Sequence, residues 1–267
     1  MKKFGIIQGR LSKSENDELQ CFPKEWKAEF LDAKNLGIGF IELLSERDFN
    51  SSNPIWSNSG REQILFEAQK NNLEIYSSCT DYVIANSILN NETGKHVHLF
   101  IDASYKLGCK LVIFPLFGKS DFNYKNSQEL IEILRYFGNY CAKKNITLGI
   151  ESPRTTQELI FLIDKVNLQN VRCVFDTGNR AVFALDVADE IRELSELICH
   201  VHIKDKNHKD ENVALGTGLI NFKKIFDAFA EINYQGPFVF ESVRGKNPYT
   251  TAEFNLNFSN YFFNESY

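Results

Sequence analysis

Short apolar segments alternate with longer amphipathic stretches along the chain, and this alternation constrains the fold more than any other feature. Apolar runs of four to eight residues are typical of buried strands, whereas apolar residues at i, i+3 and i+4 are typical of helices. The sequence predicts eight strands, at residues 4–8, 39–43, 73–78, 111–116, 147–152, 173–177, 199–204 and 238–242. Helical patterns lie between them, at residues 25–36, 62–70, 97–107, 128–144, 156–166 and 222–231.

The spacing of these strands predicts an α/β fold, a (β/α)8 TIM barrel, as a single domain over residues 1–267. Successive strand ends are 25 to 39 residues apart, and no linker interrupts them. Eight such β-then-α units match a barrel of about 250 residues. An open, doubly wound sheet is the alternative fold, and it would carry a glycine-rich phosphate loop after strand one. That place holds Gln8-Gly9-Arg10 instead.

Charge and cysteine usage bear on partners and location. A net charge of −5 argues against a nucleic-acid partner, because nucleic-acid binders usually present a basic face. The six cysteines are at least 26 residues apart, so no C-x-x-C pair exists and reduced core cysteines are expected. No apolar run approaches the roughly 18 residues of a membrane span, and no signal peptide is evident. We expect a cytoplasmic protein that binds neither nucleic acid nor a membrane.

Three carboxylates and one imidazole stand at the ends of four consecutive predicted strands. These residues are Glu151 in ITLGIES, Asp176 in CVFDTGN, His202 in CHVHIKD and Glu241 in FVFES. In a barrel, the carboxyl ends of the strands form the active-site face. Carboxylates gathered there repel one another unless a cation lies between them, and oxygen ligands with one imidazole suit Mn²⁺ or Mg²⁺. The pattern therefore predicts a divalent-metal site.

Each of the four residues also has a purely structural interpretation. Glu151 could cap the next helix, and Asp176 could form a turn in its D-T-G sequence. His202 could be a hydrogen-bonded core histidine, and Glu241 could pair with Arg244 on the surface. Four separate coincidences at four successive strand ends are less plausible than one site, so the pattern favours the metal site.

The pattern of these four residues resembles that of the xylose-isomerase-like TIM-barrel superfamily. Two motifs add to the resemblance: H-x-H-x-K-D on strand seven and G-x-G before the last βα unit. Within this superfamily, the chain most resembles the sugar-phosphate isomerase/epimerase group, which includes ketose 3-epimerases and hydroxypyruvate isomerase. The stretches GIIQGRLS, CFPKEW, GIGFIELL and NPIWS also resemble a subgroup of sugar isomerases. The resemblance implies that Glu151, Asp176, His202 and Glu241 bind one divalent metal ion, Mn²⁺ foremost, with Mg²⁺, Co²⁺ or Zn²⁺ as alternatives. It also implies that Glu151 and Glu241 are catalytic and exchange the substrate's proton.

Candidate substrate-binding residues come from the same resemblance and from positions at strand ends. The family often has His three residues after the strand-six Asp, where this chain has Asn179. It often has Arg shortly after the strand-seven His, where this chain has Lys204, Lys206 and His208. Lys204 shares a strand face with His202, so we expect it to point into the site. Gln8 and Arg10 follow strand one and could contact the substrate, and Glu42, near the end of strand two, could bind a substrate hydroxyl or instead pair with a lysine.

The sequence therefore predicts a metal-dependent isomerase or epimerase of a sugar or sugar phosphate, acting by proton transfer through a metal-stabilised enediolate. Two glutamates permit proton return to a neighbouring carbon or to the opposite face, so isomerisation and epimerisation both stay open. A metal-dependent lyase that dehydrates a keto-polyol is one alternative, and a non-catalytic metal- or sugar-binding barrel is another. A last helical face, with Phe254, Phe258, Tyr261 and Phe262, either packs on the barrel or forms a homodimer contact.

Overall fold

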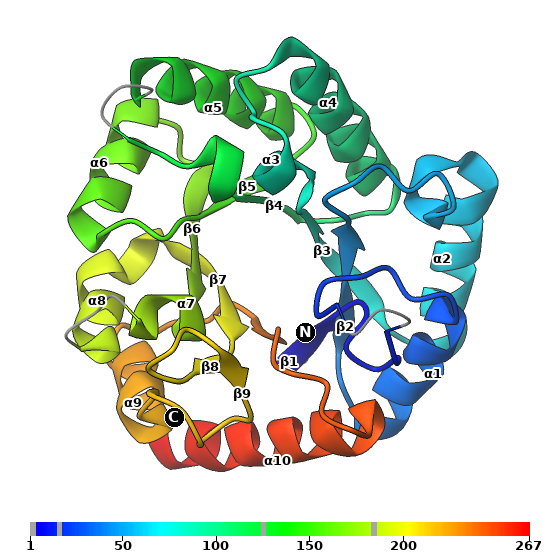
Figure 1. Ribbon diagram of the computed structural model, residues 1–267, viewed down its shortest axis with the longest axis vertical. Helices are drawn as coiled ribbons and strands as arrows, with labels where there is room; N and C mark the ends of the chain where they lie inside the picture. Colours follow the sequence, from blue (N-terminus) through cyan, green and yellow to red (C-terminus); the bar gives the residue numbers. More distant parts are fainter. Residues whose placement is uncertain (1–3, 15–17, 124–126, 183–185) are drawn as a thin grey trace. The chain divides into compact units, whose positions relative to one another are not determined.

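The computed structural model describes residues 4–14, 18–123, 127–182 and 186–267. Contacts divide the chain into two compact units, one of residues 1–40 and 174–267 and the other of residues 41–173. The boundaries fall inside the second and sixth strands of the predicted series. Strands and helices alternate along the chain, as the sequence predicts (Figure 1).

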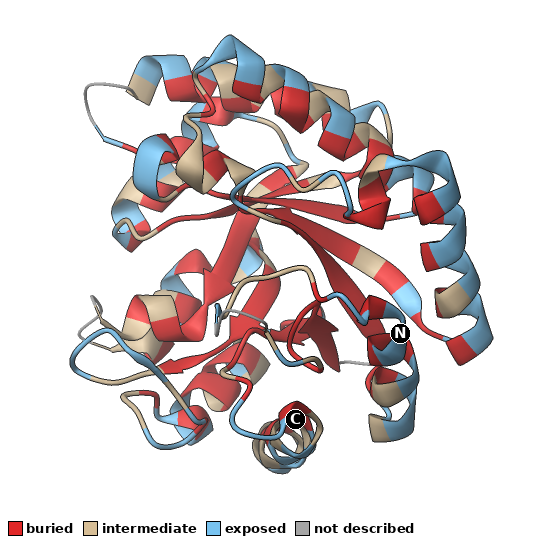
Figure 2. Ribbon diagram, turned by 45° about the vertical axis from the view of Figure 1, so that its right-hand side comes forward, coloured by how far each residue is buried: buried red, intermediate tan, exposed pale blue. Residues whose placement is uncertain are grey.

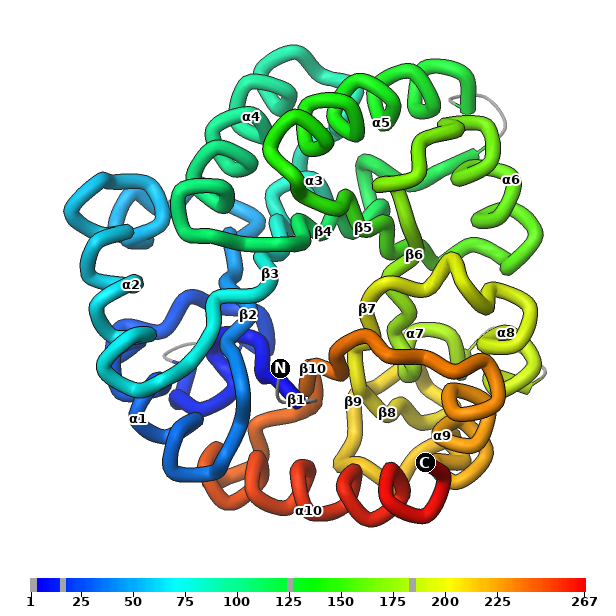
Figure 3. Tube along the Cα trace, turned by 180° about the vertical axis from the view of Figure 1, so that it is seen from behind, coloured from blue at the N-terminus to red at the C-terminus, as the bar shows by residue number. Residues whose placement is uncertain are grey.

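The first unit holds three parallel strands with their helices and a small hairpin. Strand β10 lies between β1 and β7 and pairs with both, so that Phe238 is level with Phe4 on one side and Val201 on the other. Helix α10 runs beside α9 (Figure 3). The elements are β1 (Phe4–Ile7), α1 (Trp26–Leu36), α7 (Thr177–Ala181), α8 (Val187–Leu194), η3 (Ser195–Leu197), β7 (Ile198–Ile203), β8 (Asp205–Lys206), β9 (Asn212–Val213), α9 (Phe222–Glu231), β10 (Phe238–Phe240) and α10 (Pro248–Ser266).

The second unit is built around strands β3, β4 and β5. Strand β4 pairs in parallel with both neighbours, with Leu111 level with Ser77 and with Thr147, and β5 pairs in turn with the start of β6. The elements are β2 (Phe40–Ser45), η1 (Pro54–Trp56), α2 (Asn58–Asn71), β3 (Glu74–Thr80), α3 (Tyr82–Ala85), α4 (Asn91–Lys106), β4 (Leu111–Pro115), η2 (Gly118–Ser120), α5 (Ser127–Ala142), β5 (Thr147–Glu151), α6 (Thr156–Val166) and β6 (Val171–Asp176).

Most residues of the longer strands are buried, and these strands are largely red in Figure 2. In β1, β2, β4 and β10 every residue is buried. Parallel strands covered on both faces read as unbroken apolar runs rather than as alternating patterns. This is why the strands could be found in the sequence as short apolar segments.

Asparagine and glycine residues stop the helices. A left-handed backbone conformation at the helix end lets the last carbonyls find N–H donors, and Gly and Asn adopt it at the lowest cost. Such residues follow α1, α2, α4, α5, α6 and α9: Gly37, Asn72, Gly108, Asn145, Asn167 and Asn233.

The sequence analysis missed three short helices and misplaced some ends. Helices α3, α7 and α8 have at most eight residues each, too few for a clear helical period. Strand β2 continues to Ser45, so Glu42 lies inside the strand rather than at its end. No disulfide joins any of the six cysteines, and no helix in the described ranges is long and apolar enough to cross a membrane.

A buried carboxylate of α1 holds the chain that follows β1. Glu29 accepts hydrogen bonds from the backbone N–H groups of Gly9, at 3.0 and 3.1 Å, and of Leu11, at 3.0 Å. Burial raises the pKa of Glu29 to about 7, although these hydrogen bonds and the charge of Arg10 act to lower it. Glu29 therefore fixes the backbone on both sides of Arg10.

We expect this carboxyl to make the protein less stable as the pH rises from about 4.5 to 7. The unfolded chain releases the proton near pH 4.5, whereas the folded chain keeps it to about pH 7, so ionisation costs the folded state. Relative to Glu29→Gln, the wild type should lose about 3 kcal/mol of unfolding free energy between pH 4.5 and pH 8. Urea unfolding of both proteins measures this, with exposed Glu25→Gln as the control. A constant difference across that range would show that Glu29 does not titrate there.

Helix α10 packs on the first unit through part of its aromatic face. The ring of Phe258 lies 4.9 Å from that of Phe222, and Phe262 also contacts Phe222. Phe254 and Tyr261, in contrast, are 50% and 61% exposed. The helix is thus partly packed, as one of the two predictions states, and the homodimer stays a prediction.

If Phe254 and Tyr261 form a homodimer contact, the double variant Phe254→Ser, Tyr261→Ser should lower the measured mass toward that of the monomer, because apolar contact area is lost. Light scattering at several concentrations tests this. Tyr105→Ser, at an exposed position of α4, is the matched control. A dimer that survives the double change excludes this face as the contact.

Candidate active site

Three of the predicted metal-binding residues come together within the first unit. Asp176 ends β6, His202 is the fifth residue of β7, and Glu241 directly follows β10. Each offers one ligand atom, and these atoms all lie within 4.8 Å of one another. All three side chains are buried. Two carboxylate oxygens and an imidazole nitrogen at this spacing suit a divalent cation.

The ammonium group of Lys204 lies among these three residues. Its Nζ is 2.8 Å from Asp176 Oδ2 and 3.0 Å from Glu241 Oε2. His202 Nδ1 is 2.9 Å from the same Glu241 oxygen. Burial alone would raise the pKa of Glu241, but the charges of Lys204 and His202 outweigh it and hold that pKa well below its ordinary value. The positive charge of Lys204 thus lies within 3.0 Å of the carboxylates of both Asp176 and Glu241.

The sequence D-T-G after β6 has a separate task for each residue. The Asp176 side chain caps α7 by accepting a hydrogen bond from Asn179 N–H at 2.7 Å. The Thr177 hydroxyl donates to Lys204 O at 2.6 Å and accepts from Lys204 N–H at 3.0 Å. At Gly178 an added Cβ would lie 2.8 Å from Lys204 Cγ, so a larger residue would displace the lysine. Thr177 and Gly178 therefore position Lys204, which the sequence analysis did not anticipate.

Asp205 organises the loop between β9 and α9. Its carboxylate is fully buried and accepts hydrogen bonds from the N–H groups of Gly216, Gly218 and Ile220, at 2.9 to 3.2 Å. A buried carboxylate that receives several backbone N–H bonds is well compensated. The K-D pair of strand seven thus divides its tasks, with Lys204 facing the carboxylates and Asp205 holding the loop.

The loop after β1 brings a further polar residue that the sequence analysis missed. Gln20 donates from its amide nitrogen to Glu241 Oε1, and its amide oxygen accepts from Arg10 Nη2 at 2.7 Å. Arg10 also donates to Leu19 O. Gln20 is 221 positions from Glu241 in the sequence, so no local pattern could have linked them.

The second unit carries two of the other candidates. Glu151 is the last residue of β5 and is buried. Glu42 is fully buried within β2 and accepts a hydrogen bond from the Ser77 hydroxyl at 2.6 Å. Ser77 is thus a hydroxyl partner of Glu42, where the sequence analysis had considered a substrate hydroxyl or a lysine.

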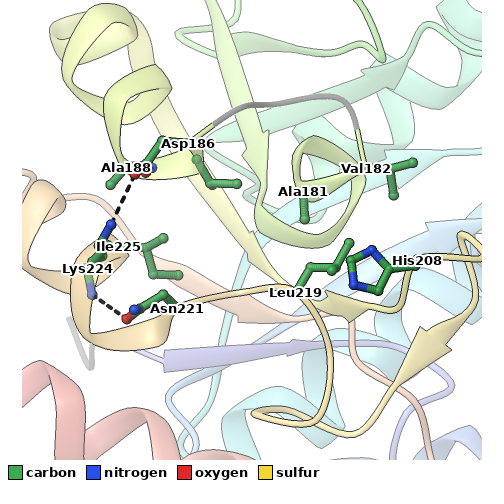
Figure 4. Close-up of a pocket in the computed structure, with 10 residues that line it drawn as sticks. Ala181, Val182, Asp186, Ala188, His208, Leu219, Asn221, Lys224 and Ile225 are labelled. Atoms are coloured by element: carbon green, nitrogen blue, oxygen red, sulfur yellow. Dashed lines mark hydrogen bonds and ion pairs between the residues drawn. The ribbon is translucent and has the colours of Figure 1, made fainter.

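The remaining candidates lie in different surroundings. Gln8 directly follows β1 and is 1% exposed, and neither polar atom of its amide has a hydrogen-bond partner in the described ranges. Asn179 lies in α7, three residues after Asp176. His208 is exposed and lines a separate cavity of about 450 cubic ångströms. This cavity lies between the starts of α8 and α9, with Lys224 opposite His208 (Figure 4). None of the clustered residues Asp176, His202 and Glu241 lines that cavity.

Comparison with known proteins identifies the family. The family described as xylose isomerase-like TIM barrel matches residues 30–259, most of the chain. The chain belongs to this family. A solved structure of L-ribulose 3-epimerase matches 100% of this chain and 96% of its own, with a TM-score of 0.79 at 17% identity. The predicted (β/α)8 barrel and the predicted family are therefore confirmed.

Relatives within the family catalyse more than one reaction. An inosose dehydratase of Geobacillus thermodenitrificans is 25% identical over 191 residues, 57% of this chain and 63% of that protein. A D-psicose 3-epimerase of Enterocloster bolteae is 25% identical over 134 residues, 45% of this chain and 43% of that protein. The match thus covers less than two thirds of the length of either relative. The names of these two relatives thus give a dehydratase of inosose and a 3-epimerase of D-psicose.

We expect Asp176→Asn to lower the affinity for Mn²⁺ at least about 100-fold. Asparagine can still cap α7 through its side-chain oxygen, so the fold should be retained while a charged ligand is lost. Isothermal titration with Mn²⁺, alongside circular dichroism, measures both. Asp186→Asn is a matched control, since Asp186 caps α8 in the same way but lies outside the cluster. Unchanged Mn²⁺ affinity in Asp176→Asn would mean that the metal binds elsewhere.

Proposed function

We propose that this protein is a divalent-metal-dependent isomerase or epimerase of a sugar or sugar phosphate. The observation that carries the proposal is the buried group of Asp176, His202 and Glu241, with Lys204 against both carboxylates. We propose Glu151, at the end of β5, as the fourth ligand and the second proton-transferring carboxylate. Its place at a strand end in this barrel family supports that assignment.

The donor set indicates which ion would be held. Carboxylate oxygens with a single imidazole favour Mn²⁺, with Mg²⁺, Co²⁺ and Zn²⁺ as alternatives. These residues would hold a divalent ion, and its positive charge would stabilise the negative charge that develops on a carbonyl oxygen when a proton is removed from the adjacent carbon.

The side chains of the chain itself would move the proton. Glu241 is ionised at neutral pH, because its pKa is held low, and so can accept a proton from carbon. We propose that Glu151 acts from the other face of the substrate and that Lys204 donates hydrogen bonds to an oxygen that gains charge. Gln8, Arg10, Asn179 and Glu42 are the proposed substrate contacts. His208 would touch only a substrate long enough to reach its cavity.

A dehydratase is the second candidate, and the inosose dehydratase relatives favour it. Dehydration begins with the same proton removal and differs in the loss of a hydroxyl group from the neighbouring carbon. Lys204 could then donate a proton to that leaving hydroxyl. The products separate the two functions, because only dehydration changes the substrate's mass.

We also propose a cytoplasmic location and a small carbohydrate as partner, with no nucleic acid or membrane. The six cysteines without a disulfide and the net charge of −5 support this.

In D₂O, turnover should place solvent deuterium on the substrate carbon beside the carbonyl. A carboxylate that removes the proton can exchange it with solvent, whereas a hydride shift between carbons would retain the original hydrogen. Proton NMR of a panel of ketoses and ketose phosphates, with Mn²⁺ added, measures the label. Full activity without label in any product would mean that the proton-transfer mechanism is wrong.

Glu151→Gln and Glu241→Gln should each raise the barrier by about 4 kcal/mol or more, because the amide cannot accept the proton. Both residues are proposed ligands, so Mn²⁺ content must be measured in each variant first. Glu265→Gln, at an exposed position of α10, is the matched control. A metal-replete Glu151→Gln protein with near-normal turnover would remove Glu151 from the mechanism.

A further inference from the structure

Gln20 lies between a buried arginine and a proposed metal ligand, and it binds both. Its amide nitrogen donates a hydrogen bond to Glu241 Oε1, and its amide oxygen accepts one from Arg10 Nη2 at 2.7 Å. Arg10 Nη2 is itself 3.9 Å from the same Glu241 oxygen, which is close enough for an ion pair but too far for a hydrogen bond between these two atoms. An uncharged amide therefore stands between the guanidinium group and the carboxylate.

The chemistry of these two neighbours fixes which way the Gln20 amide points. A guanidinium group can only donate hydrogen bonds, and an ionised carboxylate can only accept them. The amide oxygen must therefore face Arg10, and the amide N–H groups must face Glu241. Glutamine satisfies both partners, whereas a glutamate would present a second negative oxygen to Glu241 and a methionine would present no donor.

Other side chains hold the backbone that carries Gln20. Arg10 donates to Leu19 O, and Arg244 donates to Glu18 O. Arg10 follows β1 and Arg244 follows β10, so these bonds tie the segment to the ends of two paired strands. Both bonds go to backbone carbonyls and do not depend on the side chain at position 20. A change of that side chain should therefore leave the segment in place.

The two oxygens of Glu241 have different partners. Oε1 accepts from Gln20, whereas Oε2 lies 2.9 Å from His202 Nδ1 and 3.0 Å from Lys204 Nζ. Oε2 thus faces the other residues of the proposed metal site, and Oε1 faces the segment that contains Gln20. A hydrogen bond to Oε1 limits rotation of the carboxylate, so both oxygens keep these places.

A direct pair with an arginine would bind this carboxylate differently. Arg180, elsewhere in the first unit, binds both oxygens of Glu190, at 2.6 and 2.7 Å. Such a fork engages both oxygens of a carboxylate. The Gln20 amide engages one oxygen of Glu241 and adds no positive charge that would compete with a metal ion.

We propose that Gln20 is a positioning residue for Glu241, which holds Oε1 so that Oε2 binds the metal ion. This inference rests on the proposed function, since it takes Glu241 as a metal ligand. Without the amide donor, the carboxylate could turn toward Arg10, and the ion would lose a well-placed oxygen. Partners that orient a metal ligand in this way typically contribute about 10- to 100-fold to metal affinity.

Gln20→Met tests the proposal, because it removes the amide donor and keeps much of the length and volume of the side chain. We expect it to weaken Mn²⁺ binding at least about tenfold in isothermal titration. We also expect the visible spectrum of the Co²⁺-loaded protein to change, since this spectrum depends on the number and geometry of the ligand atoms. Gln128→Met is the matched control and should change neither. Gln128 also donates to a glutamate, Glu132, at 2.8 Å, but at an exposed position of α5.

The outcomes separate positioning from a purely structural role, once circular dichroism and the melting temperature show which variants fold. A structural role would lower the melting temperature and leave the Co²⁺ spectrum of the folded protein unaltered. An unaltered spectrum in Gln20→Met, or an equal loss of Mn²⁺ affinity in Gln128→Met, would overturn the inference.

A second measurement uses the wild type and decides the matter if Gln20→Met does not fold. In a crystal structure of the Mn²⁺-loaded protein, the ion should lie on Glu241 Oε2 and the Gln20 amide on Oε1. An ion on Oε1, or a Gln20 amide that does not contact Glu241, would contradict the inference. Failure of the wild type to bind Mn²⁺ and Co²⁺ would count against the proposed function and this inference with it, whereas normal binding in a folded Gln20→Met protein would count against this inference alone.

Discussion

The burial of Asp176 beside Glu241 is the constraint on which the rest of the site depends. Removing a carboxylate from water costs several kcal/mol, and two of them side by side add repulsion. Lys204 compensates both, at 2.8 and 3.0 Å. The Thr177 hydroxyl, which binds the backbone of Lys204, and the absence of a side chain at Gly178 both fix the position of this lysine. Much of the polar structure of the first unit thus serves to keep one ammonium group in place.

The same arrangement defines how a divalent ion and Lys204 would share the site. Both carry positive charge, and both are attracted to the same two carboxylates. A bound ion would weaken the hold of Asp176 and Glu241 on the lysine, which would release its N–H donors for a substrate oxygen. Gln20 also donates a hydrogen bond to Glu241 Oε1. That oxygen would keep this donor whether Lys204 or a divalent ion lies beside the carboxylate. Under this proposal, Lys204 would stabilise the carboxylates before the ion binds and a substrate oxygen afterwards.

The sequence alone was sufficient to predict where the strands lie and which polar residues stand at their carboxyl ends. Buried parallel strands leave continuous apolar runs, and the period of two placed Lys204 on the same face as His202. The residues that support the site could not be found this way. Gln20 reaches Glu241, and Thr177 reaches Lys204, through contacts between segments far apart in the chain. Helix α8 was missed because eight residues give too short a period, and Glu42 was placed at a strand end because the predicted strand stopped at Leu43 whereas β2 continues to Ser45.

Relatives with the names of a dehydratase and of epimerases share this barrel family, so the barrel does not by itself select the reaction. A divalent ion held by the proposed ligands would stabilise negative charge on a substrate oxygen in either case, so the choice of substrate would come from the residues around them. In this chain those residues are unusually cationic for a protein of net charge −5, since Lys204, Arg10 and Arg244 are all buried. Lys204 is paired with Asp176 and Glu241, and Arg10 lies 3.9 Å from Glu241, so the carboxylates beside them balance these charges inside the barrel, where electrostatic interactions are strong.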